Sequence, residues 1–102
     1  MKTIISDLNT IYRVAILDLS SQHNIVSISQ LADLDLNFTV TKITSLNHPC
    51  DFELILGDKG ADPIPVTAAG VIIEDQEIKG DIYLFNSNTS ITPLNLLIQG
   101  IK

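Results

Sequence analysis

Turn-forming residues divide this chain so often that no long helix has room to form. Gly, Pro, Asn, Asp and Ser recur at short intervals, and the apolar segments between them are brief. A parallel α/β fold needs crossover connections of about a dozen residues or more, usually helices, and no segment supplies one. The sequence therefore predicts an all-β chain of about seven short strands, arranged as a small sandwich or barrel. Periodicity alone leaves that choice open.

The hydropathy pattern places the first expected strands. Apolar and polar residues alternate over 33–41, which predicts a half-buried strand that begins near Leu36, because Asp is a poor strand former. The nearly continuous apolar segment 11–19 predicts a strand covered on both faces or lying at a subunit contact. A turn at 20–24 then predicts that 25–28 returns as the second strand of a hairpin.

Further strands are expected over 51–56, 64–66, 82–85 and 91–101, and a small hairpin over 70–79. Proline on both sides of Ile64 indicates that 64–66 is an edge strand. The five glycines are spaced as turn punctuation: Gly57, Gly60, Gly70, Gly80 and Gly100.

One short helix is expected near 28–34. Ser27 and Gln30 have the spacing of a capping box, in which the first side chain accepts a hydrogen bond from the backbone three residues later. Leu31, Ala32 and Leu34 follow with the spacing of one or two helical turns. We expect one β domain over residues 1–102, with N- and C-terminal arms that dock on neighbouring subunits.

The composition excludes several classes of partner. Twelve acidic residues against six basic ones give a net charge of −6, so neither nucleic acid nor an anionic membrane is expected as a partner. Ile, Leu and Val make up 34 of the 102 residues, which is a large aliphatic content for so small a domain. This excess predicts a homo-oligomer or a larger assembly; the alternative is a well-packed monomer.

The N-terminal segment predicts no secretion. Asp7, Asn9 and Arg13 interrupt its apolar character, and no apolar run is long enough to span a bilayer. We expect the protein in a virion or in the cytoplasm of the producing cell. The single cysteine, Cys50, excludes an internal disulfide framework.

Two segments have some features of a cation site. Asp33, Asp35 and Asn37 begin like a calcium loop, but Phe38 and Thr44 stand where the loop needs Gly and Glu. Asp58 and Asp62 flank a glycine-containing loop and leave a hard cation open as an alternative to simple turn formation. We expect no metal at either segment and no cofactor.

Catalytic arrangements are equally incomplete. His48 and Cys50 lie two residues apart and could share one side of an extended segment as a thiolate pair or as half of a zinc site, but further ligands are lacking. Ser20 and Ser21 near His23 read as a turn. We therefore expect no catalytic residue, and the protein is predicted not to be an enzyme.

The candidate functional residues are instead contact residues. Apolar candidates for a subunit interface, or for a central strand or docked C-terminal arm, are Ile11, Val14, Ile16, Leu17, Tyr83, Phe85, Ile91, Leu94, Leu96, Leu97 and Ile98. An acidic face that accounts for the whole net charge is expected from Asp51, Glu53, Asp58, Asp62, Glu74, Asp75, Glu77 and Asp81.

Two functions compete on this basis. The first is a structural or assembly subunit, of the style found in auxiliary or decoration proteins of viral particles such as phage capsids. The second is an acidic binding module or inhibitor that docks on a basic patch of a partner protein. A small-ligand carrier or enzyme in a β-barrel ranks last, because no set of convergent polar groups is evident.

Overall fold

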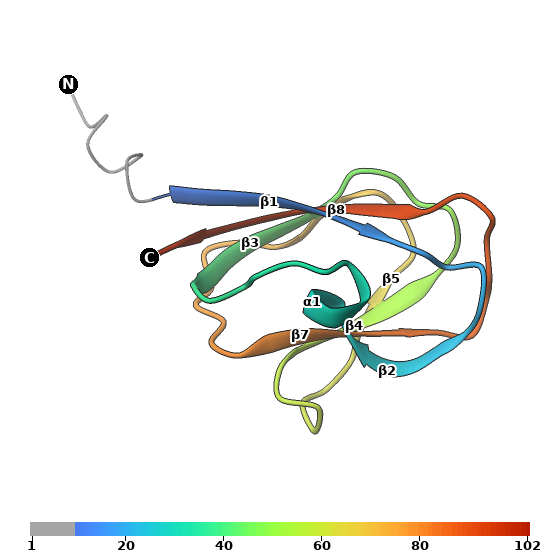
Figure 1. Cartoon of the computed structure of the whole chain (residues 1–102), viewed down its shortest axis with the longest axis horizontal. Helices are drawn as coiled ribbons and strands as arrows, with labels where there is room; N and C mark the ends of the chain where they lie inside the picture. The colour runs from blue at the N-terminus through green and yellow to red at the C-terminus, as the bar shows by residue number, and fades with distance from the viewer. Residues whose placement is uncertain (1–9) are drawn as a thin grey trace.

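The protein is built from two four-stranded antiparallel sheets packed face to face (Figure 1). The structure is a computed structural model that describes residues 10–102. The strand order in the first sheet is β1 (Thr10–Leu17), β8 (Leu94–Ile101), β3 (Thr39–Ser45) and β6 (Gly70–Ile73). The order in the second sheet is β2 (His23–Ser27), β7 (Asp81–Asn86), β4 (Phe52–Gly57) and β5 (Ile64–Val66). The all-β prediction is confirmed, and the two separate sheets make the fold a sandwich.

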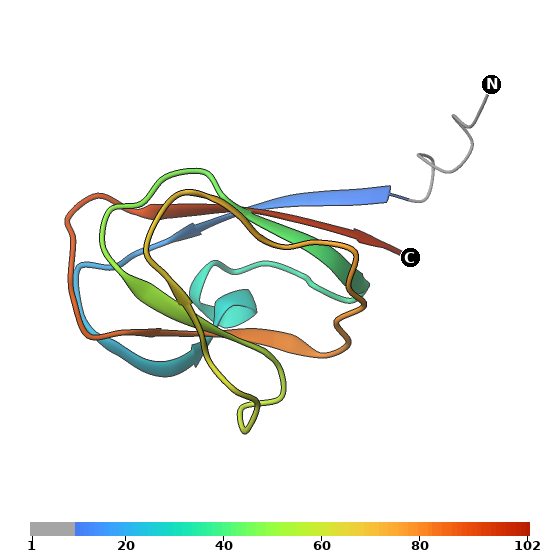
Figure 2. The same ribbon diagram turned by 180° about the vertical axis from the view of Figure 1, so that it is seen from behind.

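The core lies between the sheets and follows from the two-residue period of the strands. Ile82 and Leu84 of β7 are fully buried, as are Leu94, Leu96 and Ile98 of β8. Burying each of these side chains contributes roughly 1.5–3 kcal/mol. The two layers therefore adhere through alternate residues, and Figure 2 shows them from behind, with the loop between β4 and β5 projecting from the second sheet.

The helix start predicted at Ser27 is confirmed. Ser27 is the N-cap of α1 (Ile28–Leu31), and its Oγ accepts a hydrogen bond from the Gln30 N–H at 3.4 Å. The Ser27 hydroxyl also donates to Asp81 Oδ2, and Ser29 Oγ donates to the same oxygen at 2.7 Å. One serine thus joins the helix start to β7, and α1 lies between the two layers in Figure 1.

Replacing Ser27 with alanine is expected to lower the free energy of unfolding by about 1–2 kcal/mol, because the helix loses its cap and Asp81 loses a donor. Urea denaturation followed by circular dichroism measures this loss. Ser87→Ala is the matched control, since Ser87 is exposed and only its backbone oxygen accepts a hydrogen bond. Equal midpoints for the two variants would contradict the capping role.

The strand expected over 33–41 starts later than predicted. β3 begins at Thr39, and Leu34 and Leu36 lie half-buried in the loop before it. Local side-chain chemistry explains the difference: Asp33 takes a left-handed φ of 55° after the helix, and Asp35 Oδ1 accepts a hydrogen bond from the Asn37 N–H at 3.1 Å. Asp and Asn favour such turns over strands.

Both predicted hairpins are wrong. β2 does not pair with β1; it crosses to the second sheet and pairs with β7. The segment 70–79 does not fold back on itself, because β6 pairs with β3 and Ile78 forms a further bridge to Val40 of the same strand. In both places the pairing partner lies far away in the sequence, and turn residues indicate only that the chain bends. The expected strands at 51–56, 64–66 and 82–85 are confirmed, and β5 is an edge strand as its prolines predicted.

Candidate functional site

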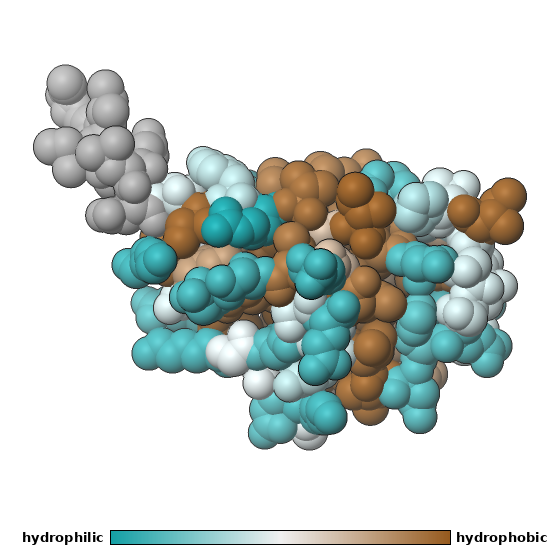
Figure 3. All heavy atoms as spheres, viewed as in Figure 1, coloured by the Kyte–Doolittle hydropathy of each residue, from teal (hydrophilic) through white to brown (hydrophobic). Residues whose placement is uncertain are grey.

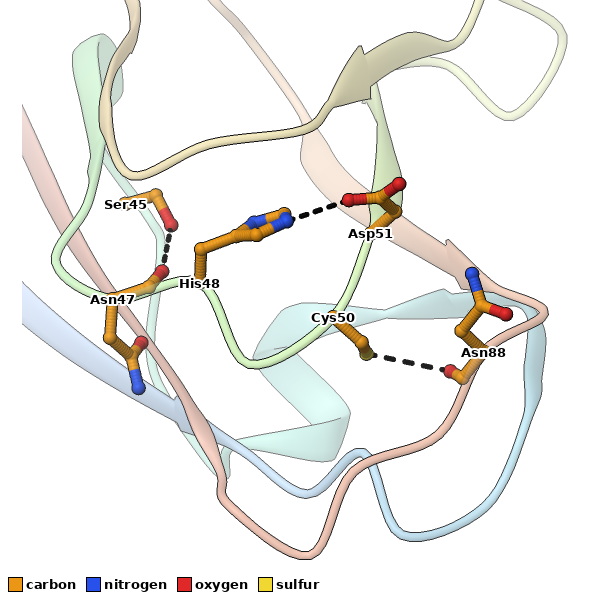
Figure 4. Close-up of polar contacts among 6 residues, drawn as sticks. All are labelled: Ser45, Asn47, His48, Cys50, Asp51 and Asn88. Atoms are coloured by element: carbon orange, nitrogen blue, oxygen red, sulfur yellow. Dashed lines mark hydrogen bonds and ion pairs between the residues drawn. The ribbon is translucent and has the colours of Figure 1, made fainter.

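The chemically most suggestive residues, His48, Cys50 and Asp51, lie in the turn that leads into β4 (Figure 4). His48 Nε2 is 2.6 Å from Asp51 Oδ1, whereas the Cys50 thiol points toward the 86–90 turn and donates to the Asn88 carbonyl oxygen at 3.5 Å. Burial, together with the nearby charge of Asp51, raises the pKa of the Cys50 thiol. A nucleophilic cysteine requires a lowered pKa and an adjacent base, so this arrangement does not favour a thiolate pair.

Ser20 and His23 form hydrogen bonds to Asp18, within the same stretch of chain. The Ser20 N–H donates to Asp18 Oδ1 at 2.8 Å, and His23 Nε2 lies 2.8 Å from the Asp18 carbonyl oxygen. The hydrogen bonds from Ser20 lower the pKa of the Asp18 carboxyl group. His23 therefore orders the loop and makes no hydrogen bond that would activate a serine.

The two candidate cation segments also use their carboxylates locally. Asp35 caps its own turn, and Asp58 Oδ1 accepts a hydrogen bond from the Gly60 N–H at 3.1 Å. Within residues 10–102, no three His, Cys, Asp or Glu side chains lie close enough together to hold a metal ion.

An open depression of about 650 Å³ lies between the 34–39 loop and the 79–81 turn. Its polar lining includes Ser29, Lys79 and Asp81. The Asp81 carboxylate is engaged by the hydroxyl groups of Ser27 and Ser29 and by the Ile82 N–H at 2.7 Å. Through these hydrogen bonds the Asp81 carboxylate holds β7 against the start of α1.

The acidic residues do not gather on one surface. Glu53 lies on the outer face of the second sheet, and Asp58 and Asp62 lie in the loop between β4 and β5. Glu74 and Asp75 lie beside the first sheet, where they line a second, separate depression together with Thr10 and Lys42. Asp81 is half-buried in the network described above. The charge run is continuous in sequence but divided between the two layers in space.

Four of the apolar interface candidates belong to the core. They are Leu17, Leu94, Leu96 and Ile98, all fully buried between the sheets. The prediction of a C-terminal docking arm is also wrong. Residues 94–101 form β8, which pairs with β1 on one side and with β3 on the other. An N-terminal arm would involve residues 1–9, which lie outside the described part of the chain.

The remaining candidates differ in exposure. Val14, Ile16 and Ile91 are exposed, and Ile91, at 98 %, lies in the loop between β7 and β8. Ile11 and Leu97 are half-buried. Tyr83 and Phe85 are half-buried on the outer face of the second sheet, where Lys59 Nζ lies 5.8 Å from the centre of the Tyr83 ring. The surface with the largest exposed apolar side chains is therefore on the first sheet.

An apolar stripe crosses the outer face of the first sheet, and we call it the outer apolar face. Its members are Tyr12, Val14 and Ile16 of β1, Leu97 of β8 and Val71 of β6. The strand register aligns Val14 with Leu97, Leu97 with Thr44, and Thr44 with Val71, which is one row across all four strands. Tyr12 is 56 % exposed, Val14 50 % and Ile16 61 %. Figure 3 shows hydrophobic atoms gathered over β1 at the top of the view.

Of the two alternatives for 11–19, coverage of both faces is wrong, since β1 buries only one face within the described residues. A subunit contact stays a prediction. Sequence reasoning missed two members of the outer apolar face, Tyr12 and Val71. Tyr12 had a usable signal, because it stands two residues from Val14 and four from Ile16 and must share their side of a strand. Val71 had none, because only the pairing of β6 with β3 brings it into the row.

Comparison with known proteins finds no match. No protein-family model matches the sequence, and neither a curated protein nor a solved structure matches it significantly. Within residues 10–102, none of the helical structure has the length and apolar character needed to cross a membrane. The functional argument therefore starts from the outer apolar face.

Proposed function

We propose that this protein is a non-enzymatic structural subunit that forms a homo-oligomer through its outer apolar face, and that this oligomer belongs to a larger protein assembly. The observation that supports the proposal is the set of exposed apolar side chains on β1, whose row continues through half-buried Leu97 and Thr44 to Val71. Contiguous exposed apolar surface is typical of protein interaction sites. The side chains considered for catalysis or metal binding, in contrast, form hydrogen bonds that order loops: Asp18 and Asp35 bond within their own turns, and Cys50 donates to the Asn88 carbonyl oxygen.

A viral-particle subunit, such as an auxiliary or decoration protein of a phage capsid, is the specific form of this proposal. The small size, the all-β fold and the surface of branched aliphatic side chains support it. Such a protein contributes area and hydrogen bonds to an assembly and needs no catalytic group. The proposed location, a virion or the cytoplasm of the producing cell, follows from the same role.

The test is the mass of the protein in solution, measured by light scattering on a sizing column at low and high salt. We expect a dimer or larger species whose mass is the same at both salt concentrations, because apolar contacts are not screened by salt. Ile16→Asp is expected to reduce the mass to that of the 11.1 kDa chain. Ile91→Asp, which places the same charge on an almost fully exposed loop residue outside the outer apolar face, is the control and should leave the assembly intact.

A monomer at both salt concentrations would contradict the proposal. The acidic binding module would then be the better interpretation, and it predicts a complex with a basic partner that weakens steeply as salt rises. The divided arrangement of the acidic residues argues against that alternative, because charge-steered docking works best from one concentrated patch.

A further inference from the structure

The four edges of the two sheets differ in how well they are protected. Unpaired strand edges invite association, and proteins usually blunt them with proline, bulges or short strands. β5 is a three-residue strand that contains Pro65. β2 has a register shift between His23 and Val26, with Ile25 at a φ of 59°. β6 is four residues long, starts at Gly70 with a φ of 127°, and also shows a register shift against β3.

β1 has none of these protections within its described residues. It is eight residues long, contains neither proline nor glycine, and pairs with β8 in an unbroken register from Thr10 to Leu17. No residue of β1 has a positive φ. Its one charged side chain is Arg13, whose guanidinium lies 5.8 Å from the centre of the Phe38 ring. β1 is thus a long, regular edge of the kind that pairs with another strand.

The hydrogen bonds of β8 show which backbone groups of β1 are unpaired within residues 10–102. The Asn95 carbonyl oxygen accepts from the Leu46 N–H at 2.9 Å, and the Gln99 carbonyl oxygen accepts from Thr41 Oγ1 at 3.4 Å, so both point toward β3. Because successive residues of a regular antiparallel strand bond to opposite sides, Leu96 and Ile98 bond to β1.

Leu96 and Ile98 are in register with Ala15 and Arg13 of β1. The alternate residues Tyr12, Val14 and Ile16 therefore direct their N–H and C=O groups to the free edge. The Tyr12 carbonyl oxygen accepts a hydrogen bond from Arg13 Nη1 at 3.0 Å, which agrees with this orientation and leaves the oxygen its second lone pair. The same three residues carry the exposed apolar side chains and the free backbone groups.

We propose that β1 pairs antiparallel with β1 of a second copy, about a two-fold axis at Val14, so that the two first sheets become one continuous sheet. The inference rests on the proposed function, because it places the contact between copies at the β1 border of the outer apolar face. Val14 then faces Val14 of the second copy, and Tyr12 faces Ile16, so these exposed side chains pack side by side across the new pair of strands. The same contact pairs the backbone groups at the edge of β1.

The register of the proposed β1–β1 pair follows from the direction in which its side chains point and from the charge of Arg13. Residues opposite each other in an antiparallel pair point to the same side of the sheet, so a symmetric pair must be centred on a residue. Centring on Arg13 places two guanidinium groups directly opposite each other, which is unfavourable. Centring on Val14 pairs Arg13 with Ala15 and keeps residues 11–17 in the ladder. Centres farther from the middle of β1 leave fewer residues paired.

Cysteine cross-linking tests the register directly, in a Cys50→Ser background that removes the native thiol. The Cα atoms of a hydrogen-bonded pair are about 5.5 Å apart, a separation that a disulfide spans. Val14→Cys is therefore expected to form a covalent dimer under mild oxidation. Val71→Cys is the matched control, because Val71 is equally exposed on the same face, at the opposite edge of the sheet, and it should stay uncross-linked.

Two further single-cysteine variants measure the offset. Tyr12→Cys and Ile16→Cys should cross-link with each other when mixed, and neither should cross-link with itself, since the like positions lie roughly 13 Å apart along the strands. Self-linking of Tyr12→Cys, or equal linking at Val71→Cys and Val14→Cys, would overturn the proposed register and edge.

Backbone substitution separates edge pairing from simple apolar contact. Val14→Pro removes an N–H that faces the free edge and no bond to β8, whereas Val14→Thr keeps the N–H and the branched shape. We expect the proline variant to lose the dimer and the threonine variant to retain it, with unchanged circular dichroism for both. If the wild-type protein assembles but the proline variant assembles equally well and Val14→Cys fails to cross-link, the edge contact is wrong and the proposed function stands. A monomeric wild-type protein contradicts both.

Discussion

Replacing Gly100 with alanine should lower the free energy of unfolding by about 2–4 kcal/mol, an unusually large cost for adding one methyl group. Gly100 lies inside β8, where it pairs with Ile11 on one side and with Val40 on the other. A Cβ atom there would lie 2.2 Å from the Thr39 carbonyl oxygen and 2.5 Å from the Phe38 ring. Because the Thr39 oxygen belongs to the backbone of β3, it cannot move without disturbing the strand pairing.

The measurement is urea denaturation of the variant against wild type. Gly60→Ala is the control, because its nearest atom, Asp58 Oδ1, lies at an ordinary 3.8 Å and Gly60 has no positive φ. We expect less than about 0.5 kcal/mol for the control. A Gly100→Ala protein as stable as Gly60→Ala would mean that β3 and β8 do not approach each other as closely as described.

Gly100 also shows why part of the fold was beyond sequence reasoning. Its spacing from the other glycines predicted a turn, yet it lies within a strand, beneath the Phe38 ring and beside the register shift between Val40 and Lys42. The need for glycine comes from the close approach of a strand that is distant in sequence. Local rules succeeded where the cause was local, as with the Ser27 cap and the prolines of β5.

The candidate site shows the same difference between features with a local cause and features that depend on distant strands. In the structure, Val14 shares a face with Ile16, and Leu94 shares a face with Leu96 and Ile98, as strand alternation requires. The predicted interface residues were not divided by face, because alternation does not say which face of a strand meets the other sheet, so core and surface residues were pooled. That assignment depends on β8 being a central strand of the first sheet, and the order β1-β8-β3-β6 is a property of the assembled sheet. The register row from Val14 to Val71 is absent from any single segment.

A buried amide provides the second large prediction. Asn86, which is 1 % exposed, accepts a hydrogen bond from the His23 N–H at 3.0 Å. Its Nδ2 atom donates to the Ser21 carbonyl oxygen at 3.3 Å and to the Asn88 carbonyl oxygen at 2.7 Å. One side chain thus ties the chain entering β2 to the turn after β7, and it directs β2 to the second sheet. This long-range contact accompanies the pairing of β2 with β7, which is found in place of the predicted β1–β2 hairpin.

Asn86→Asp is expected to cost about 3 kcal/mol or more at pH 7. The carboxylate keeps the bond from the His23 N–H but presents negative oxygens to the Ser21 and Asn88 carbonyl groups, which both lose their donor. Asn88→Asp is the matched control, because Asn88 is exposed and only its backbone oxygen takes part in these contacts. We expect the control to change stability by less than about 0.5 kcal/mol.

The pH dependence of the Asn86→Asp effect follows from the protonation state of the new carboxyl group. Burial beside two carbonyl oxygens raises its folded-state pKa above the value of about 3.9 in the unfolded chain. Below the unfolded value the group is neutral in both states, and its hydroxyl can donate to one carbonyl, so the loss relative to wild type is smallest there. As pH rises from the unfolded pKa toward the folded pKa, the unfolded state releases its proton first, and relative stability falls. Urea midpoints at pH 4 and pH 7, each taken against wild type at the same pH, measure this difference. If the variant and wild-type midpoints differ by the same amount at pH 4 and at pH 7, the new carboxylate is solvated. Residue 86 is then not buried between the chain entering β2 and the turn after β7.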